Sequence, residues 1–476
     1  MTAAPRPFSP RGAAFDLVIV GGGSAGFAAA IKGAELGARV AIVESGTLGG
    51  TCVNVGCVPS KTLIRAAEAH HRRVHHGFAG IPSTDGAPVW DAVRSQKDDL
   101  VSQLRETKYR QVLRSYSAVT LFEQRAELVS GHSVRFADGR NIDAGKIIVT
   151  TGASPLPAEI PGLADVPYLD NVTAMALDRL PHSLIVIGGS AVGLELAQMF
   201  ARLGVKVTVL EALPHVVPLE DADVGAALGD YLRAEGINVH AGVQISKVAH
   251  DGNSYCVYLA AAGASRVVRG DQMLVATGRR ANTSGFGLET VGVMLGKRRE
   301  IMVNEFLQTA NPDVYAAGDV IGDPMFVYVA AYGGSLAAEN ALTGNVRCYD
   351  LAALPKVTFT DPAVASVGLT PDQAVGIVPL VTTLPLEHVP RALAARDTRG
   401  FIKLIADGAT RKIIGAHILA AEAGEMITEV TLAIKFGLTI DDLVSTFHPY
   451  LTLSEGVKLA AQTFDKDVKL LSCCAS

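Results

Sequence analysis

A glycine-rich turn between an apolar strand and an alanine-rich helix opens the first ordered segment of this chain. The segment has a strand at 15–20, the glycines Gly21, Gly23 and Gly26, a helix to about residue 36, and a strand at 39–43 followed by Glu44. Gly21 makes the turn, Gly23 lets the backbone approach a pyrophosphate, and Gly26 allows close helix packing. An acid in the place of Glu44 accepts hydrogen bonds from a ribose. The pattern predicts a dinucleotide-binding unit of an α/β fold.

A second copy follows later in the chain. It has a strand at 183–187, then Gly188, Ser190 and Gly193, a helix, a strand at 205–210, and Glu211. Its middle glycine is a serine, so this motif alone is weaker, but its spacing to the acid matches the first copy. Two such units predict two nucleotides, a bound flavin dinucleotide and a visiting nicotinamide dinucleotide.

The remaining segments suggest how the two units are arranged along the chain. Short alternating stretches at 118–148 predict a β-meander. Two similar strands, 147–152 and 274–278, each end in Thr-Gly, where the chain enters and leaves an inserted second domain. A helix is expected at 332–341, and strands at 356–359, 401–405 and 413–419 are expected before further helices.

Composition excludes several other classes of protein. A chain of 476 residues predicts roughly three or four domains. The net charge of −5 argues against a nucleic-acid partner. No apolar run reaches the ~18–20 residues of a membrane span, and residues 1–14 read as a flexible tail without the apolar core of a signal peptide. Six cysteines in so long a chain do not make a secreted disulfide scaffold, so a cytoplasmic location is expected.

The cysteines form two pairs suited to different work. Cys52 and Cys57 are spaced so that their sulfurs can be bridged across about one turn of helix. Cys473 and Cys474 are adjacent on what should be a mobile end, where an internal disulfide would be badly strained. Two exposed thiolates make a trap for a soft metal ion. A redox pair and a thiol trap together predict an enzyme that delivers electrons to a thiol-bound metal.

The segment Gly49-Gly-Thr-Cys52-Val-Asn-Val-Gly-Cys57-Val-Pro-Ser-Lys61, and the order of the units around it, carry a family resemblance. The chain from Phe15 onward resembles the flavin-dependent disulfide reductases, the class I pyridine nucleotide-disulfide oxidoreductases. The terminal pair Cys473–Cys474 resembles the mercuric reductases within that family, in a form without their N-terminal metal-binding domain. The resemblance implies an α/β fold with two Rossmann-like domains, for FAD and NAD(P), and a C-terminal α+β dimerisation domain. The expected boundaries are 15–152 with 283–352 for FAD, 153–282 for NAD(P), and 353–476 for dimerisation.

The resemblance also implies roles for matched residues. Lys61 would sit beside the flavin, paired with Glu195 near the nicotinamide. Cys57 would be the thiolate that touches the flavin, and Cys52 the outward thiol that meets substrate. The full FAD set would be Gly21, Gly23, Gly26, Glu44, Thr51, Lys61, Gly318 and Asp319. The NAD(P)H set would be Gly188, Ser190, Gly193, Glu195, Glu211 and Gly278.

The chain departs from the family's disulfide reductases near its end. Those enzymes carry a His-Pro-x-x-x-Glu pattern whose histidine protonates the leaving thiol of the substrate. Here His448 lies seven residues before Glu455, and Tyr450 takes the place of the histidine. Metal reduction has no leaving thiol that must be protonated, and a tyrosine, a poor acid near neutral pH, can contact a thiol-bound metal. Tyr109, on a helical stretch at 97–113, resembles the second tyrosine of the mercuric reductase site, and His448 remains an alternative to Tyr450.

The function implied is reduction of thiol-bound Hg(II) to Hg(0) by an obligate homodimer. Cys473 and Cys474 would capture Hg(II) near the partner subunit's flavin and pass it to Cys52 and Cys57. One alternative is a disulfide reductase of the dihydrolipoamide dehydrogenase or glutathione reductase type. Another is a protein that buffers metal on thiols without turnover, which two nucleotide units and Lys61 argue against.

The nicotinamide preference is ambiguous. NADPH is the family default, but an acid at Glu211 favours the free ribose hydroxyl of NADH and repels a 2′-phosphate. Neighbouring arginines, Arg202 and Arg233, lie before Glu211 or well after it. Unusually good use of NADH is therefore expected.

Other candidate residues receive simpler interpretations. Cys256 and Cys348 have no partner at a useful spacing and are expected to be inert thiols. The cluster of His70, His71, His75 and His76 has spacings that can hold a metal. With arginines between them, a solvated basic helix face is the favoured interpretation.

Overall fold

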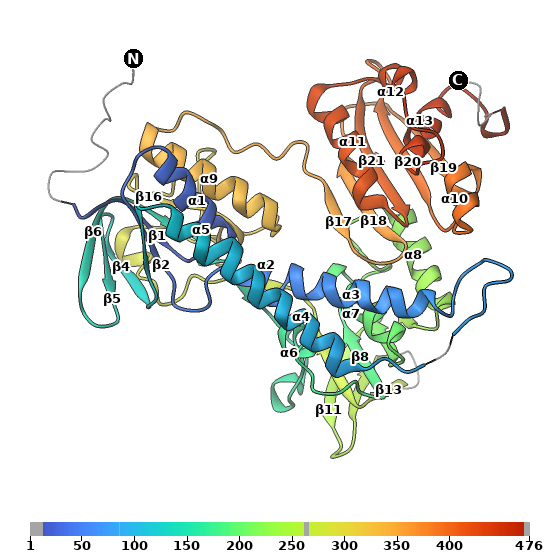
Figure 1. Ribbon diagram of the computed structural model, residues 1–476, viewed down its shortest axis with the longest axis horizontal. Helices are drawn as coiled ribbons and strands as arrows, with labels where there is room; N and C mark the ends of the chain where they lie inside the picture. The colour runs from blue at the N-terminus through green and yellow to red at the C-terminus, as the bar shows by residue number, and fades with distance from the viewer. Residues whose placement is uncertain (1–12, 85, 261–265, 471–476) are drawn as a thin grey trace. The chain divides into compact units, whose positions relative to one another are not determined.

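The structure is a computed structural model that describes residues 13–84, 86–260 and 266–470 (Figure 1). These residues form two compact units. The first comprises 13–62, 94–158 and 278–350, and the second comprises 63–93, 159–277 and 351–470. The tail up to residue 12 and the pair Cys473–Cys474 lie outside the described residues. No helix within the described ranges combines the length and the apolar character needed to cross a bilayer.

The first unit is built on a parallel sheet. The order is β3-β2-β1-β6, with β16 against the other side of β6. Because strands covered on both faces read as continuous apolar runs, 15–20 was recognisable from sequence, and the predicted strand is confirmed. The strands are β1 (Phe15–Val20), β2 (Val40–Val43), β3 (Val119–Phe122), β6 (Asn141–Val149) and β16 (Val314–Ala316).

Two helices of the first unit, α1 (Ser24–Glu35) and α9 (Val327–Thr343), lie side by side (Figure 1). A Cβ at Gly334 would lie 2.0 Å from the backbone oxygen of Ala25, so the contact requires glycine. The helix predicted at 332–341 is thereby confirmed, and it begins earlier than expected.

The expected meander at 118–148 is only partly correct. Strands β4 (Ala126–Ser130) and β5 (Ser133–Phe136) pair antiparallel with each other, and β5 pairs with β6. However, β3 pairs parallel with β2 and extends the main sheet. An alternating pattern shows that a segment is a strand but does not identify its partner, which tertiary contacts decide.

The second unit repeats the parallel arrangement in the order β10-β9-β8-β14. Its helix α7 (Ala191–Arg202) comes directly after the second glycine turn, and α8 (Ala222–Ala234) precedes β10. The strands are β8 (Ser183–Ile187), β9 (Lys206–Leu210), β10 (Asn238–His240) and β14 (Gln272–Val275), with a separate antiparallel sheet of β11 (Ile245–His250), β12 (Tyr255–Leu259) and β13 (Arg266–Gly270). The second predicted dinucleotide unit therefore has the expected strand–turn–helix–strand form.

The same unit contains a five-stranded antiparallel sheet in the order β17-β18-β21-β20-β19. The sequence predicted β17, β20 and β21 but missed β18 and β19. The strands are β17 (Lys356–Thr358), β18 (Ala363–Gly368), β19 (Pro379–Pro385), β20 (Phe401–Asp407) and β21 (Ile413–Ala420). Helices α11 (Ala423–Phe436), α12 (Ile440–Ser445) and α13 (Glu455–Gln462) come after this sheet in the chain.

The two glycine turns leave no room for other residues at their tightest points. Gly21 has a φ of 113°, and Gly188 has a φ of 110°. A Cβ at Gly26 would lie 1.9 Å from the oxygen of Gly21, and one at Gly193 would lie 2.0 Å from that of Gly188. At Gly23, by contrast, the nearest protein atom would be 3.7 Å away. The protein itself therefore tolerates a side chain at Gly23 but not at Gly26.

This contrast predicts different outcomes for two alanine substitutions. Gly26→Ala should lower the thermal midpoint of the apoprotein or prevent folding, because its Cβ collides with backbone. Gly23→Ala should leave that midpoint within about 2 °C but lower the flavin content, because its methyl group occupies the space where the backbone must approach a pyrophosphate. Flavin absorbance per protein and apoprotein melting curves measure both effects. A Gly23→Ala protein that retains flavin as tightly as the wild type would contradict the interpretation.

Candidate active site

Helices α1 and α7 both begin without a side-chain cap. The residues before their first turns, Gly23 and Ser190, make no side-chain capping bond in the described structure, and neither first turn holds an acid. The first N–H groups of a helix need acceptors, and they carry its positive dipole end. Both helix starts thus fit a phosphate group, as the two glycine motifs predicted.

The acids that end β2 and β9 make the same contacts in both copies. Glu44 accepts hydrogen bonds from the N–H groups of Gly22 and Gly46, both at 2.6 Å. Glu211 accepts from the N–H groups of Gly189 at 2.7 Å and Leu213 at 2.8 Å. Each carboxylate therefore fixes a glycine turn to the strand beside it, where a ribose hydroxyl is expected.

Asp319 lies directly after β16 in the first unit. It opens a short 3-10 helix at Asp319–Ile321, and Gly318 before it has a φ of 78°. Burial raises the pKa of Asp319, and Arg279, whose guanidinium lies 3.7 Å away, acts against that rise. A partly buried carboxyl group at a strand end suits a polar ligand group, and the ribityl chain of FAD stays the predicted ligand there.

The cysteine motif is seated on the first glycine turn. Gly50 has a φ of 63°, and a Cβ on it would lie 2.6 Å from the Cα of Gly23. The N–H of Gly49 also donates to the oxygen of Gly22 at 2.9 Å. Helix α2 (Gly50–Val55), which carries the exposed Thr51 and the partly buried Cys52, therefore starts against the expected pyrophosphate site.

Cys52 and Cys57 lie on two different helices, which corrects the expectation of one turn of a single helix. Helix α2 ends before Gly56, whose φ of −126° and ψ of −112° break the helical path. Cys57 is the first residue of α3 (Cys57–Arg72). A Cβ at Gly56 would lie 2.9 Å from the oxygen of Thr51, so the break depends on glycine. Both cysteines are partly buried.

The two thiols are electrostatically unequal. The hydrogen bond with Cys57, and then burial, raise the pKa of Cys52, while Lys61 acts in the opposite direction. The raised pKa keeps the proton on Cys52. A helix N-terminus stabilises a thiolate, and Lys61 lies one turn further along the same helix. The thiolate role that the resemblance gives to Cys57 stays a prediction.

Tyr109 lies beside the cysteine motif on a π-helical segment at Arg105–Arg110. The expected helix at 97–113 is therefore interrupted: α4 (Trp90–Leu104) and α5 (Gln111–Ser115) flank the segment. The ring of Tyr109 packs 4.7 Å from that of Phe27, between ring centroids. Burial raises the pKa of Tyr109, and Cys52 raises it further. Insertions of this kind are frequent at functional sites.

Tyr328 is a residue that no sequence motif singled out. It lies in the first turn of α9, and burial, with a further contribution from Cys57, raises its pKa to about 12. The family motif does not include it, and a tyrosine in an apolar helix usually serves only in packing. Its electrostatic coupling to Cys57 places it near the cysteine pair.

The loop between α12 and α13 carries Tyr450, which is 57 % exposed. His448 beside it uses both ring nitrogens: Nε2 lies 2.5 Å from an oxygen of Glu429, and Nδ1 lies 3.1 Å from the oxygen of Thr446. Glu455 accepts the backbone N–H of Leu451 at 3.2 Å, and His448 is paired with Glu429 instead of Glu455. The histidine–glutamate pair of a disulfide reductase is therefore absent from this loop as described.

Glu195, which is expected beside the nicotinamide, lies on α7. Glu195 is 6 % exposed and accepts the N–H of Phe359 at 2.9 Å. Gly278 has a φ of 152° with open space where a side chain would lie. The Lys61–Glu195 ion pair stays a prediction.

The histidine cluster is more embedded than expected. The side chain of His71 is 15 % exposed, stacks on His75 at 4.2 Å between ring centroids, and lies 3.4 Å from Glu235. Burial, followed by the charge of Arg202, lowers its pKa to about 4. A solvated face is therefore the wrong description of His71. The described residues contain no group of three or more side chains able to hold a metal ion. Cys256 is buried and Cys348 exposed, and both are free.

Known proteins resemble this chain over nearly its whole length. Residues 15–334 match the family described as pyridine nucleotide-disulphide oxidoreductase, and residues 354–461 match its dimerisation domain. A mercuric reductase of Staphylococcus aureus is 46% identical, covering 97% of this chain and 84% of that protein. A mercuric reductase of Streptomyces lividans is 48% identical, covering 97% and 98%.

Solved structures agree on the fold. The HOCl-induced flavoprotein disulfide reductase RclA of Escherichia coli superposes with a TM-score of 0.83 at 30% identity, covering 94% of this chain and 99% of that one. LpdA of Mycobacterium tuberculosis gives a TM-score of 0.84 at 28% identity over the same shares. Two dinucleotide units, a matching dimerisation domain and relatives of this similarity confirm the predicted fold class: the chain belongs to the pyridine nucleotide-disulphide oxidoreductase family.

Proposed function

We propose that this chain reduces thiol-bound Hg(II) to Hg(0) with electrons from NAD(P)H. The observation that carries the proposal is the unequal cysteine pair seated on the first glycine turn with a tyrosine beside it. A thiolate at Cys57 and a thiol at Cys52 supply two soft ligands for one metal ion. Relatives at 42–48% identity that are named mercuric reductases support the same substrate.

The residues present fit FAD and a nicotinamide dinucleotide. The first glycine turn, Glu44, Thr51, Lys61, Gly318 and Asp319 would hold FAD, and the second glycine turn, Glu195, Glu211 and Gly278 would hold NAD(P)H. Bound together, these cofactors supply the two electrons of the reaction. We assign 15–152 with 283–352 to FAD binding, 153–282 to NAD(P) binding and 353–476 to dimerisation. A cytoplasmic location fits the need for reduced nicotinamide dinucleotides.

The overall reaction balances without a leaving thiol that needs an acid. Hg(SR)₂ and a hydride equivalent give Hg(0), one thiol and one thiolate, and NAD(P)H becomes NAD(P)⁺. Cys473 and Cys474 displace the two outer thiols, and Cys52 and Cys57 then receive the metal by ligand exchange. Tyr109 and Tyr450 contact the thiol-bound metal. Hg(0) leaves because it has lost its affinity for thiolate.

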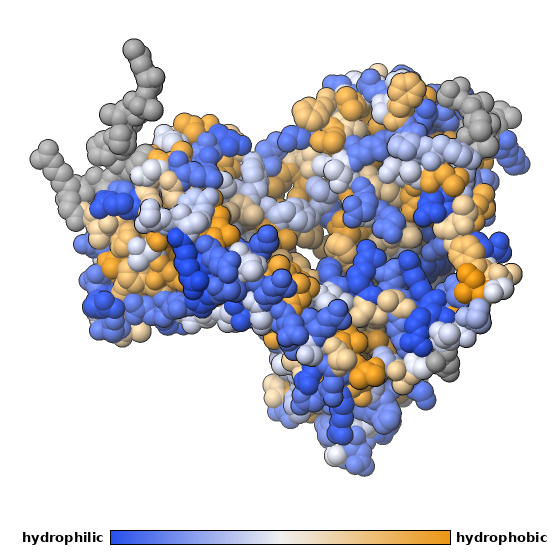
Figure 2. Space-filling view, in the orientation of Figure 1, coloured by the Kyte–Doolittle hydropathy of each residue, from blue (hydrophilic) through white to orange (hydrophobic). Residues whose placement is uncertain are grey.

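A homodimer fits this scheme because the tail and Tyr450 would serve the other subunit's flavin. The matched dimerisation domain supports two-fold assembly. Figure 2 shows hydrophobic residues on the surface over α11 and α12. Phe436 is 69 % exposed and Phe447 is 98 % exposed, which is unusual for residues of this size unless a partner covers them.

The loop around Tyr450 argues against the disulfide reductase alternative. Disulfide cleavage needs a proton donor with a pKa near neutrality. Both ring nitrogens of His448 are already directed at Glu429 and Thr446, so this ring is not placed to protonate a substrate. His448 instead braces the loop that presents Tyr450.

A substrate comparison tests the proposed function. With excess small thiol, Hg(II) should cause steady NADPH or NADH oxidation, while lipoamide and glutathione disulfide should give rates at least about tenfold lower, because the loop lacks an acid. A disulfide reductase would show the reverse order. A metal-buffering protein would oxidise no nicotinamide beyond one equivalent.

The tail provides a second arm of this experiment. Replacing Cys473 and Cys474 by alanine should lower turnover most when Hg(II) carries two bulky thiols, because only a pair of thiols that extends from the protein can displace these ligands. Much of the turnover with HgBr₂ should remain, because a small complex reaches Cys52 and Cys57 directly. Equal losses with both mercury complexes would remove the capture role.

Glu211 predicts the nicotinamide preference. Glu211 is 7 % exposed and its carboxylate is held by two backbone N–H groups, so the carboxylate cannot turn away from a 2′-phosphate at low cost. NADPH is kept as the default cofactor, and NADH should be used unusually well. Glu211→Ala should shift the ratio of kcat/KM values toward NADPH by about tenfold, which is ~1.4 kcal/mol. A wild-type preference for NADPH above a hundredfold would contradict this role of Glu211.

A further inference from the structure

A buried polar stripe runs along α7 and contacts the segment after β17. Its members are Glu195, Gln198 and Arg202, which are 6 %, 4 % and 8 % exposed. Helical spacing places these positions on one face of the helix. All three bond to the segment Phe359–Asp361. Since buried polar side chains are costly unless satisfied, the stripe is expected to hold this segment in a defined place.

Gln198 fixes the far end of that segment through its side-chain amide. Its Nε2 donates to the oxygen of Asp361 at 2.8 Å, and its Oε1 accepts the N–H of Asp361 at 2.8 Å. The same Nε2 donates to Glu235 at 2.8 Å. Three bonds to two partners allow only one orientation of the amide.

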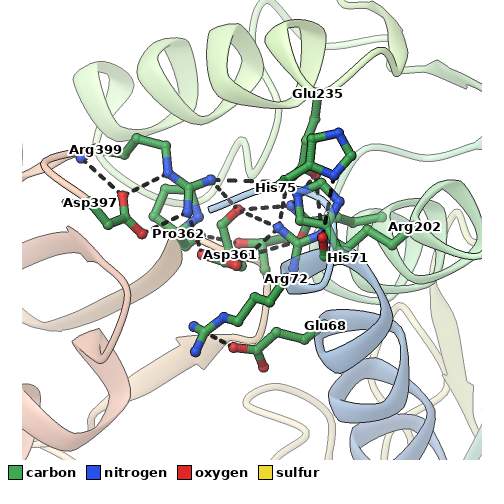
Figure 3. A network of polar contacts seen from close by, with 12 residues as sticks. Glu68, His71, Arg72, His75, Arg202, Glu235, Asp361, Pro362, Asp397 and Arg399 are labelled. Carbon is green, nitrogen blue, oxygen red and sulfur yellow. Dashed lines mark hydrogen bonds and ion pairs between the residues drawn. The ribbon is translucent and has the colours of Figure 1, made fainter. Parts of the chain in front are cut away.

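Charged residues complete the clamp around Asp361 (Figure 3). One carboxylate oxygen of Asp361 lies 3.0 Å from Arg202, and the other accepts from Arg399 at 2.8 Å. Arg202 also pairs with Glu235, and Arg399 pairs with Asp397. Two arginines thus hold three carboxylates, and both arginines contact Asp361. Asp361 is bound through its backbone and both carboxylate oxygens.

At the near end of the segment, Phe359 contacts a residue of the proposed nicotinamide site. Two residues before Asp361, the N–H of Phe359 donates to Glu195 at 2.9 Å. The contacts that hold Asp361 therefore fix the direction of the Phe359 N–H. This N–H in turn fixes the position of one carboxylate oxygen of Glu195. We propose that Gln198, Arg202 and Asp361 are positioning residues for the nicotinamide half of the reaction, acting through the Phe359 N–H on Glu195. The proposal rests on the assignment of Glu195 to the nicotinamide site under the proposed function.

This arrangement differs from a clamp that only adds stability. A buried ion pair is weak support for stability, because its desolvation offsets much of its attraction. Positioning has its own signature: a displaced Glu195 should slow hydride transfer, while the nucleotide stays bound by its glycine turn and Glu211. The effect should appear in the rate of flavin reduction and not in the affinity for NADH.

The test is Gln198→Met in the FAD-loaded enzyme, because methionine keeps the length and removes all three hydrogen bonds. Single-turnover flavin reduction by NADH, measured without mercury, should slow by about tenfold to a hundredfold. The Kd for NADH should change by less than about twofold, a shift of under ~0.5 kcal/mol. Amide hydrogen exchange at Phe359 should accelerate in the same variant, independently of activity.

Lys403→Met is the matched control within the same unit. Lys403 is 5 % exposed and pairs with Asp221 at 2.7 Å and Asp223 at 2.5 Å, so its loss also leaves carboxylates without their cation. It should lower thermal stability but leave flavin reduction and exchange at Phe359 unchanged. If both variants slowed flavin reduction equally, or Gln198→Met did not slow it, the positioning role would be overturned.

A double-mutant cycle identifies the route of the effect. In a Glu195→Ala background, Gln198→Met should add less than about twofold to the loss, because the group it positions is gone. Additive losses would contradict action through Glu195. Asp361→Asn, which keeps the backbone contacts, serves if Gln198→Met does not fold, and it should slow reduction in the same direction. Because no mercury is used, a failure of the proposed substrate would leave these outcomes unchanged.

Discussion

The contact between Gly23 and Gly50 is the constraint on which the candidate site depends. Two backbones meet where a single added Cβ would lie 2.6 Å from a Cα. One belongs to the glycine turn expected to hold a pyrophosphate, and the other begins the helix that carries Cys52. Because the two backbones touch directly, the distance between the glycine turn and the cysteine motif is fixed more rigidly than it would be by a contact between side chains. Gly56 then breaks the helix, so that Cys57 starts α3 and gains the stabilising field of a helix N-terminus.

The second unit has the same arrangement of a glycine turn and an acidic residue, but the helix after its turn makes different contacts. Glu44 and Glu211 hold their glycine turns through equivalent pairs of backbone N–H groups. The helices that begin at the two turns differ: α1 packs against α9 through small residues, whereas α7 carries a buried polar stripe. A duplicated fold therefore supplies two nucleotide-binding turns. The residues on one face of the helix after each turn determine which other segment of the protein that helix contacts. In α7, that face binds the segment Phe359–Asp361.

The sequence revealed those features that depend on local covalent geometry. Glycines with positive φ or no space for a Cβ, such as Gly21 and Gly26, and strands buried on both faces, such as β1, leave strong local patterns. The π-helical segment around Tyr109 and the helix break at Gly56 left no such pattern, because packing decides them. Strand β19 was missed because it is partly exposed and lies at a sheet edge, and β3 was misplaced because its partner lies far away in the sequence. His71 looked solvated because its neighbour Glu235 comes from a distant segment. The role of Cys473 and Cys474 rests on sequence alone.

Electrons from NAD(P)H are proposed to reach Hg(II) while Cys52 and Cys57 hold it, and this transfer is the central claim. The most direct measurement is the amount of Hg(0) vapour released per nicotinamide oxidised, in the wild type and in Cys57→Ala with FAD bound. The wild type should release one Hg(0) per NAD(P)H. Cys57→Ala should release no Hg(0) above the background without enzyme, although NAD(P)H still reduces the flavin. Release of Hg(0) by Cys57→Ala at the wild-type ratio and rate would contradict the claim, because the metal would then be reduced without the cysteine pair.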